Sequence, residues 1–217
     1  GLANVEVDEI ETLTIVSNTN ATGATTTNEI EELDIAEAAS LVFSGAADFD
    51  ANSVVNTTAL TSVVSSAMTG DLTLTGLDAS ALTLTDGSGD LTVTMAGLTN
   101  ADTIDGGTGT DTVTGLSVTG LTATTGKFNV SNVDTLIVQA TGANTFDLST
   151  LSSVGAFAIS GATPGTQTLT NVAAGQVIQL GEATGTGVVF DNGDEVDITM
   201  ADATGAADSL TINVEND

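Results

Sequence analysis

The sequence contains no Arg, His, Cys, Trp or Tyr, and its only basic residue is Lys127. Nucleic acids and anionic membrane surfaces are bound through Lys and Arg, so neither is an expected partner. Triads and zinc sites built on His or Cys are excluded. A carboxylate pair, as in glycosidases, is the remaining acid–base chemistry, but six Phe with no Trp or Tyr offer few aromatic platforms to a sugar. The composition therefore predicts a protein that is not an enzyme.

Two further absences concern the membrane and the stability of the fold. No apolar run approaches the roughly 18 residues of a membrane-spanning helix, so membrane insertion is not expected. Without Cys no disulfide can form, and a bound metal is the obvious substitute in an extracellular protein. The chain starts at Gly1 without a signal segment, which we interpret as a mature protein or a piece excised from a longer one.

Acidic residues dominate the charge of the chain. Asp and Glu number 29 in 217 residues, which gives a net charge of −28 whose self-repulsion only solvent, salt or bound cations can relieve. The chain is nevertheless apolar enough to fold, with 41% hydrophobic residues and a mean hydropathy of +0.28. A packed core in one or two domains is expected.

Short runs that alternate apolar residues with Thr predict β-strands. They begin at Leu72, Leu82 and Leu91, and apolar anchors continue at Ile104 and Val113. Steps of nine to thirteen residues are too short for strand–helix–strand units. We therefore expect an all-β fold, either an irregular parallel β-solenoid like a β-roll or a β-sandwich, with calcium-binding turns. Residues 1–68 are expected to form an N-terminal β segment and residues 69–217 a solenoid-like region, the two being either separate or one continuous domain.

Two local patterns qualify this picture. Leu60, Val63, Val64 and Met68 have helical spacing, so residues 57–68 form either a short amphipathic helix or another irregular strand. A motif of the form apolar–acid–x–Leu–x–β-branched recurs at 10–15, 30–35 and 133–138. The spacing of its first two copies suits a single solenoid turn. Its acids, Asp134 among them, are either ligands or the solvated face of a strand.

The sharpest motif is Gly106-Gly107-Thr108-Gly109-Thr110-Asp111-Thr112-Val113-Thr114. It matches the calcium-binding nonapeptide of glycine-rich β-roll proteins, and residues 97–105 are a degenerate copy. Calcium takes six to eight oxygen ligands from carboxylates and main-chain carbonyls, and Gly lets a turn point its carbonyls inward. The candidate ligands in these two repeats are Asp102, Asp105, Gly107, Gly109 and Asp111.

These two repeats, at 97–114, resemble the RTX (repeat-in-toxin) family. The wider chain, rich in Thr, Ala, Gly and Asp, is similar to RTX-bearing S-layer proteins of Gram-negative bacteria, of the Caulobacter type. The resemblance implies type I secretion, an extracellular position at the cell surface, calcium-dependent folding and assembly into a lattice. The chain departs from the family in having one perfect repeat, which favours isolated ion sites over a long regular β-roll.

Other acids are spaced at alternate residues near turns, as in calcium-binding loops. The run at 191–197 contains Asn192-Gly193, so its alternative interpretation is a hairpin turn without an ion. The candidate ligands in these runs are Asp48, Asp50 and Asn52; Asp86, Ser88 and Asp90; and Asp191, Asp194 and Asp197. The sequence predicts several calcium ions in all.

Three functions can be weighed on these grounds. We expect a structural cell-surface protein, a calcium-stabilised S-layer or matrix-fibre segment that associates with itself and, as a further partner, with cell-surface polysaccharide. The alternative is an RTX adhesin or ice-binding module, because Thr-x-Thr pairs are abundant, although their spacing along the sequence varies. A polysaccharide enzyme using carboxylates alone is the third.

Overall fold

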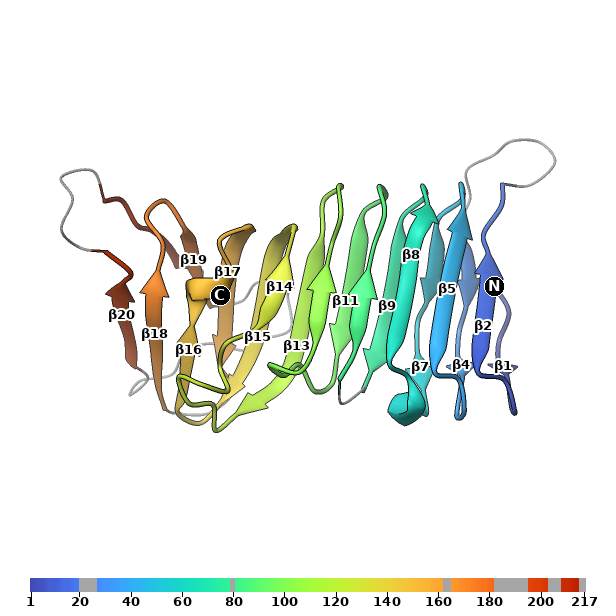
Figure 1. The fold of residues 1–217 in the computed structure, drawn as a ribbon, viewed down its shortest axis with the longest axis horizontal. Helices are drawn as coiled ribbons and strands as arrows, with labels where there is room; N and C mark the ends of the chain where they lie inside the picture. The colour runs from blue at the N-terminus through green and yellow to red at the C-terminus, as the bar shows by residue number, and fades with distance from the viewer. Residues whose placement is uncertain (20–26, 79–80, 162–164, 182–194, 203–207, 215–217) are drawn as a thin grey trace.

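The computed structural model describes residues 1–19, 27–78, 81–161, 165–181, 195–202 and 208–214. The chain winds into a parallel β-solenoid of about seven turns, with 55% of residues in strands (Figure 1). Every strand pair is parallel. Successive turns therefore stack along one axis, and neighbouring turns supply each other's backbone partners.

Two long sheets form the walls of the solenoid. The nine-stranded sheet contains, in spatial order, β3 (Asn28–Ile30), β6 (Phe49–Ala51), β9 (Leu72–Leu77), β11 (Leu91–Met95), β13 (Thr112–Thr119), β15 (Val133–Thr141), β17 (Val154–Gly161), β19 (Val177–Leu180) and β21 (Thr211–Val214). The six-stranded sheet contains β2 (Thr12–Val16), β5 (Ser40–Gly45), β8 (Ser62–Met68), β10 (Thr83–Thr85), β12 (Thr103–Asp105) and β14 (Asn129–Ser131).

Two smaller sheets and two short helical turns complete the walls. One sheet contains β1 (Val5–Glu6), β4 (Leu33–Asp34) and β7 (Val54–Val55), and the other β16 (Asn144–Asp147), β18 (Thr166–Val172) and β20 (Glu195–Met200). The 3-10 turns are η1 (Thr57–Ala59) and η2 (Leu148–Thr150).

The core lies between the walls and follows from the alternation of side chains. In β9 and β11 every second residue is buried, whereas the Thr residues between them point outward. Pairing in register stacks Leu74, Val93, Val113 and Leu136 into one column, and the opposite sheet contributes a second column of Val63, Leu84, Ile104 and Val130. All eight side chains are buried.

The solenoid prediction is confirmed, and the observed step length has a simple cause. The runs that begin at Leu72 and Leu91 lie in β9 and β11, and the run that begins at Leu82 continues into β10. These three strands alternate between the two long sheets. A step of nine to thirteen residues is therefore half a turn. A full turn is 20 residues from Leu82 to Asp102 and 23 residues from Asp111 to Asp134, because extra residues are accommodated at the corners.

Two local expectations are corrected. The helix at 57–68 is wrong: η1 covers Thr57–Ala59 and the remaining apolar residues lie in strand β8, so the irregular strand is the correct alternative. The 10–15 and 30–35 motifs are not stacked on each other, because Leu13 pairs with Leu41 and Leu33 with Val5. Paired strands also continue across residue 68, since β6 pairs with β9 and β8 with β10.

Candidate functional site

A column of aspartates runs along the corner where strands of the nine-stranded sheet begin. The Asp48 Oδ1 atom accepts a hydrogen bond from the Asp71 amide at 3.0 Å, and the Asp71 Oδ1 atom accepts one from the Asp90 amide at 2.9 Å. The Asp90 Oδ1 atom in turn accepts a hydrogen bond from the Thr110 amide at 2.8 Å. Each carboxylate thus joins its own turn to the next one through a charge-assisted hydrogen bond.

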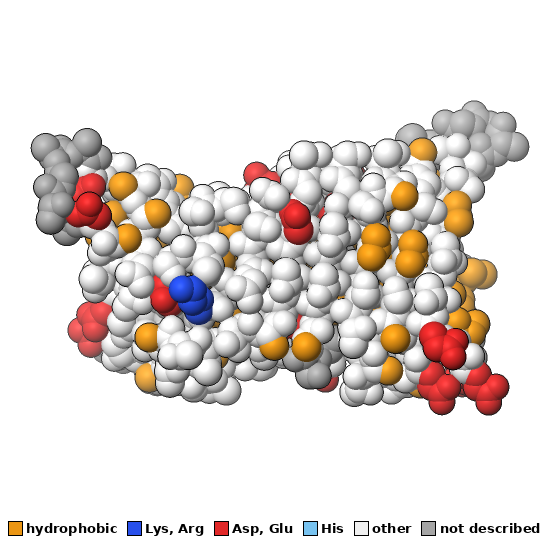
Figure 2. All heavy atoms as spheres, in the orientation of Figure 1, with side chains coloured by type: hydrophobic (Ala, Val, Ile, Leu, Met, Phe, Trp, Pro, Cys, Tyr) orange, Lys and Arg blue, Asp and Glu red, His pale blue; other side chains and the backbone are white. Residues whose placement is uncertain are grey.

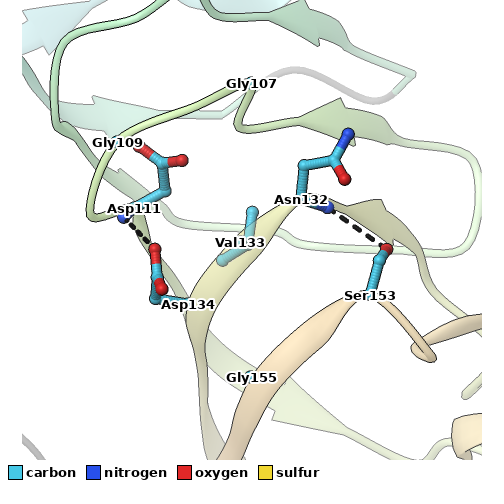
Figure 3. Close-up of a pocket in the computed structure, with 8 residues that line it drawn as sticks. All are labelled: Gly107, Gly109, Asp111, Asn132, Val133, Asp134, Ser153 and Gly155. Atoms are coloured by element: carbon cyan, nitrogen blue, oxygen red, sulfur yellow. Dashed lines mark hydrogen bonds between the residues drawn. The ribbon is translucent and has the colours of Figure 1, made fainter.

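In the next two turns the aspartate stands one residue later, relative to the strand that follows it, than Asp48, Asp71 and Asp90 do. Asp111 is buried, and its Oδ1 atom accepts a hydrogen bond from the Leu91 amide at 2.9 Å. The Asp134 Oδ2 atom accepts one from the Asp111 amide at 2.8 Å (Figure 3). We call Asp48, Asp71, Asp90, Asp111 and Asp134 the corner column.

Glycines allow the turns beside the corner column to stack closely. Gly107 has a φ of +80°, and a Cβ atom there would lie 2.4 Å from the Gly87 carbonyl oxygen. A Cβ atom on Gly109 would lie 2.2 Å from the Gly89 carbonyl oxygen. Only Gly fits both positions, because the main chains of neighbouring turns lie in direct contact there.

The acids in this region repel one another. Burial raises the pKa of Asp111 to about 6; the hydrogen bond from Leu91 opposes this rise, and the charges of Asp86, Asp134 and Asp90 add to it. The pKa of Asp86 is also raised, by burial first, although hydrogen bonds from Ser65 and Gly87 oppose the rise. The site is thus negative, partly desolvated and electrostatically strained.

A cavity opens beside these acids. It has a volume of about 260 Å³ and is lined by Gly107, Gly109, Asp111, Asn132, Val133, Asp134, Ser153 and Gly155 (Figure 3). On the side of the cavity opposite Asp111 and Asp134, the main-chain amide of Asn132 donates a hydrogen bond to the Ser153 Oγ atom at 3.2 Å. The space is sufficient for a hydrated cation next to Asp111 and Asp134.

The other acids of the two glycine-rich repeats lie away from Asp111 in the turn. Asp102 is buried at the corner where the six-stranded sheet begins, and Asp105 lies in β12. Asp102 accepts hydrogen bonds from the Leu82 amide at 2.7 Å and from the Thr99 amide and hydroxyl at 2.8 and 3.1 Å. Asp102 and Asp111, one nonapeptide apart, therefore enter different sheets, and Asp102 serves as an anchor within the fold.

Side-chain pairs account for several remaining acids. The Asp105 carboxylate accepts a hydrogen bond from the Asn132 side chain at 2.8 Å. Asn56 donates in the same way to Asp34 at 2.8 Å, and Asn171 to Asp147 at 2.9 Å. Asn56 and Asn171 both have a left-handed backbone conformation. These Asn–Asp pairs join neighbouring turns at other corners. The pattern was not recognised in the sequence, because its spacing varies between 22 and 27 residues.

Asp50 and Asn52 lie on or beside strand β6 rather than in a calcium-binding loop. The Asn52 side chain donates to the Glu29 carboxylate at 2.6 Å, and Glu29 pairs with Asp50 in the ladder. Burial, and then the charge of Glu29, raise the pKa of Asp50, whose Oδ1 atom is buried without a hydrogen-bond partner.

The remaining predicted ligands are dispersed. Ser88 is exposed in the turn before Asp90, and Asp197 is exposed on β20 beside Thr168. Asp191 and Asp194 lie outside the described residues. Within the described ranges, no three acidic side chains form a group that could hold a metal ion. An ion at the corner column would therefore also need main-chain carbonyls or water as ligands.

Sequence reasoning missed Asp71, which connects Asp48 to Asp90. Its signal is the spacing of these three acids, 23 and 19 residues, or one turn each. Lys127 lies 4.0 Å from the Asp147 carboxylate, as a partner of a nearby acid. Burial would raise the pKa of Asp147, but hydrogen bonds from Asn171 and Ser149 and the Lys127 charge outweigh it, and this pKa is lowered.

Comparison of the chain with protein-family models, with curated proteins and with solved structures finds no match. Among the described residues, no helix is long and apolar enough to cross a membrane.

Proposed function

We propose that this chain is a calcium-stabilised structural protein of the cell surface, an S-layer or extracellular matrix-fibre segment that associates with itself. The observation that carries this proposal is the corner column, in which aspartates of successive turns are stacked along the solenoid. The only basic side chain of the chain, Lys127, is engaged with Asp147. A divalent cation would favour the ionised form of Asp111, whose pKa is raised first by burial and then by the neighbouring carboxylates.

Asp111 and Asp134 are the best candidates to hold an ion, together with main-chain carbonyls or water. Asp111 and Asp134 line the cavity, and the charges of Asp86 and Asp90 act on Asp111. Carboxylates and glycine carbonyls are the hard oxygen ligands that calcium takes in flexible geometry. A bound ion would stabilise the stacking of turns, because binding to the folded state alone adds to the free energy of unfolding.

Calcium titration of wild type and two variants tests this proposal. Isothermal titration calorimetry should detect calcium binding, and excess EDTA should lower the melting temperature measured by far-UV circular dichroism. Asp111→Asn should weaken calcium binding at least tenfold. Glu37→Gln, which removes an exposed acid away from the corner column, should bind as the wild type does. A chain that binds no calcium, or whose melting is indifferent to EDTA, contradicts the proposal.

A second candidate, ice binding, is favoured by one specific observation. The spacing of the Thr-x-Thr pairs varies along the sequence, but the ladder aligns three of them: Thr73 and Thr75, Thr92 and Thr94, and Thr112 and Thr114. Rungs in a sheet are spaced about 4.8 Å apart, so these residues repeat regularly on β9, β11 and β13. Thr92 is exposed and four of the others are half-buried, whereas Thr114 is buried, so the surface array is incomplete at β13.

Thermal hysteresis decides this second candidate. An ice-binding array should give a freezing-point difference that Thr92→Leu reduces strongly. Thr83→Leu, a matched exposed Thr on the six-stranded sheet, should leave that difference unchanged. Absence of hysteresis in the wild type eliminates the candidate and leaves the structural function unaffected.

A further inference from the structure

The corner column ends at Asp134, and the next two turns carry a different residue at the same position. The register of β15, β17 and β19 aligns Gly155 with Asp134 and Gln176 with Gly155. A Cβ atom on Gly155 would lie 2.7 Å from the Asp134 carbonyl oxygen, so this position suits Gly alone. The row of carboxylates is therefore followed by a position without a side chain and then by a neutral amide.

A second cavity opens where that side chain is missing. It has a volume of about 270 Å³ and is lined by Leu151, Ser152, Val154, Gly155 and residues 173–176. Gly155 also lines the cavity beside Asp111 and Asp134, so the two cavities adjoin. We call them together the corner groove, which crosses the starts of β13, β15, β17 and β19. Its size is that of a small-molecule site, for which roughly 300–1,000 Å³ is usual.

A buried amide side chain forms one wall of the second cavity. Gln176 is 6% exposed, and its Oε1 atom accepts a hydrogen bond from the Ala173 amide at 3.3 Å. Its Nε2 atom donates to the Leu151 carbonyl at 3.4 Å, which is long for a hydrogen bond. The second proton of Nε2 makes no bond to the described part of the chain. A ligand acceptor in the cavity would satisfy this buried donor.

The rest of the groove also offers both donors and acceptors. The Ser153 Oγ atom accepts from the Asn132 amide at 3.2 Å, which leaves its own proton to donate. The Asp134 Oδ2 atom accepts from the Asp111 amide at 2.8 Å, which leaves Oδ1 to accept. A hydroxyl group both donates and accepts, whereas an ammonium group only donates and a carboxylate only accepts. This lining therefore favours a ligand with several hydroxyl groups.

The charge of the groove excludes an anionic ligand. An anion would meet the carboxylates of Asp111 and Asp134 and no basic side chain. Lys127, the single basic residue, lies 4.0 Å from Asp147 instead. Figure 2 shows this one basic side chain next to an acidic one on the surface. The ligand should thus carry hydroxyl groups without carboxylate, sulfate or phosphate.

We propose that the corner groove binds a neutral oligosaccharide. Its hydroxyl groups donate to Asp134 and accept from Ser153 and Gln176, while Leu151 and Val154 contact the carbon face of a sugar ring. The inference goes beyond the proposed function, because it assigns a saccharide site to named residues and requires no calcium ion. A structural protein of the cell surface with such a site would attach to neutral polysaccharide.

Saturation-transfer-difference NMR and calorimetry on the whole chain in EDTA test this site. The probes are maltotriose, cellotriose and mannotriose, and at least one should bind with a Kd of about 1 mM or tighter. Ser153→Leu places a larger apolar side chain at an exposed position of the groove and should weaken binding at least tenfold. Thr83→Leu, at an exposed position of the six-stranded sheet, should bind as the wild type does.

A second pair of variants tests the buried amide. Gln176→Leu removes its donor and should also weaken binding, whereas Gln179→Leu, at a half-buried Gln of the same strand outside the groove, should not. Circular dichroism checks that each variant is folded. If Gln176→Leu does not fold, the comparison of Ser153→Leu with Thr83→Leu decides.

Three results would overturn the inference. They are no binding of any of the three trisaccharides, equal weakening by Ser153→Leu and Thr83→Leu, and binding of spermidine alone, which would make the groove a cation site. Calcium titration of the same samples keeps the two proposals separate. Saccharide binding in EDTA by a chain that binds no calcium refutes the calcium site and retains the groove, whereas calcium binding without saccharide binding does the reverse.

Discussion

Replacing Asp102 should damage the fold whether or not calcium is present. Its side chain is 1% exposed and accepts three hydrogen bonds, from the Leu82 amide and from the amide and hydroxyl of Thr99. Asp102→Ala leaves the two amides without acceptors, and each unsatisfied buried amide costs about 1–3 kcal/mol. The free energy of unfolding should therefore fall by about 2–6 kcal/mol. Asp102→Asn retains one acceptor oxygen and should cost roughly half as much.

The assay is urea denaturation followed by circular dichroism, once in EDTA and once in calcium. For a chain of this length each kcal/mol corresponds to about 2–4 °C in melting temperature, so thermal melts offer a second readout. Glu37→Gln is the control, because exposed substitutions stay within about 0.5 kcal/mol of wild type. The reasoning is refuted if Asp102→Asn is as stable as wild type in EDTA, or if it loses stability only in calcium, as a ligand would.

Three further predictions concern the corner column and its turns. Gly107→Ala should lower the free energy of unfolding by several kcal/mol, because the new Cβ atom would lie 2.4 Å from the Gly87 carbonyl oxygen. Gly120→Ala, at a φ of +65° with nothing within 4 Å, should cost only the backbone strain of about 1 kcal/mol. Equal losses of stability in urea denaturation would contradict this prediction. In EDTA, stability should fall as pH rises from about 4 to 6, because Asp111 holds its proton in the folded state up to a pKa of about 6 and releases it near 3.8 when unfolded. Asp111→Asn should flatten this pH dependence in thermal melts. Calcium affinity should rise over the same pH range, since binding requires ionised carboxylates, and pH-independent affinity in calorimetry would exclude Asp111 as a ligand.

The solenoid itself could be predicted from the sequence, because a β-strand repeats every two residues whatever surrounds it. The runs at Leu72, Leu82 and Leu91 satisfy that period, and their short steps exclude helical crossovers. Pairing between turns was harder to predict. The spacing of the 10–15 and 30–35 motifs suggested stacking, but the first full turn is longer, at 28 residues from Asn4 to Glu32. Register depends on corner lengths, which the strand pattern does not encode.

The roles of the acidic residues could also be predicted only in part, because some depend on local sequence and others on how the turns stack. Residue type and neighbouring glycines single out Asp90 and Asp111 as candidate ligands, and the structure places both in the corner column. They do not reveal that Asp102, with the same local motif, is occupied by protein donors, because its partners Leu82 and Thr99 reach it only through the stacking of turns. Asp71 was missed since it lacks a motif of its own, and only its position one turn from Asp48 and Asp90 makes it part of the column.

The exclusive bonding of each turn to its two neighbours has a mechanical consequence. Among the described residues, strand pairing and backbone hydrogen bonds join each turn only to its neighbours, so under tension between the two ends of the chain the turns would detach one after another from an end of the solenoid. A turn of 20 residues, such as that from Leu82 to Asp102, would release about 70 Å of extended chain on detaching. Each detached turn would dissipate work while the remaining turns stayed intact. Under load the molecule would behave as an extensible tether that lengthens in steps.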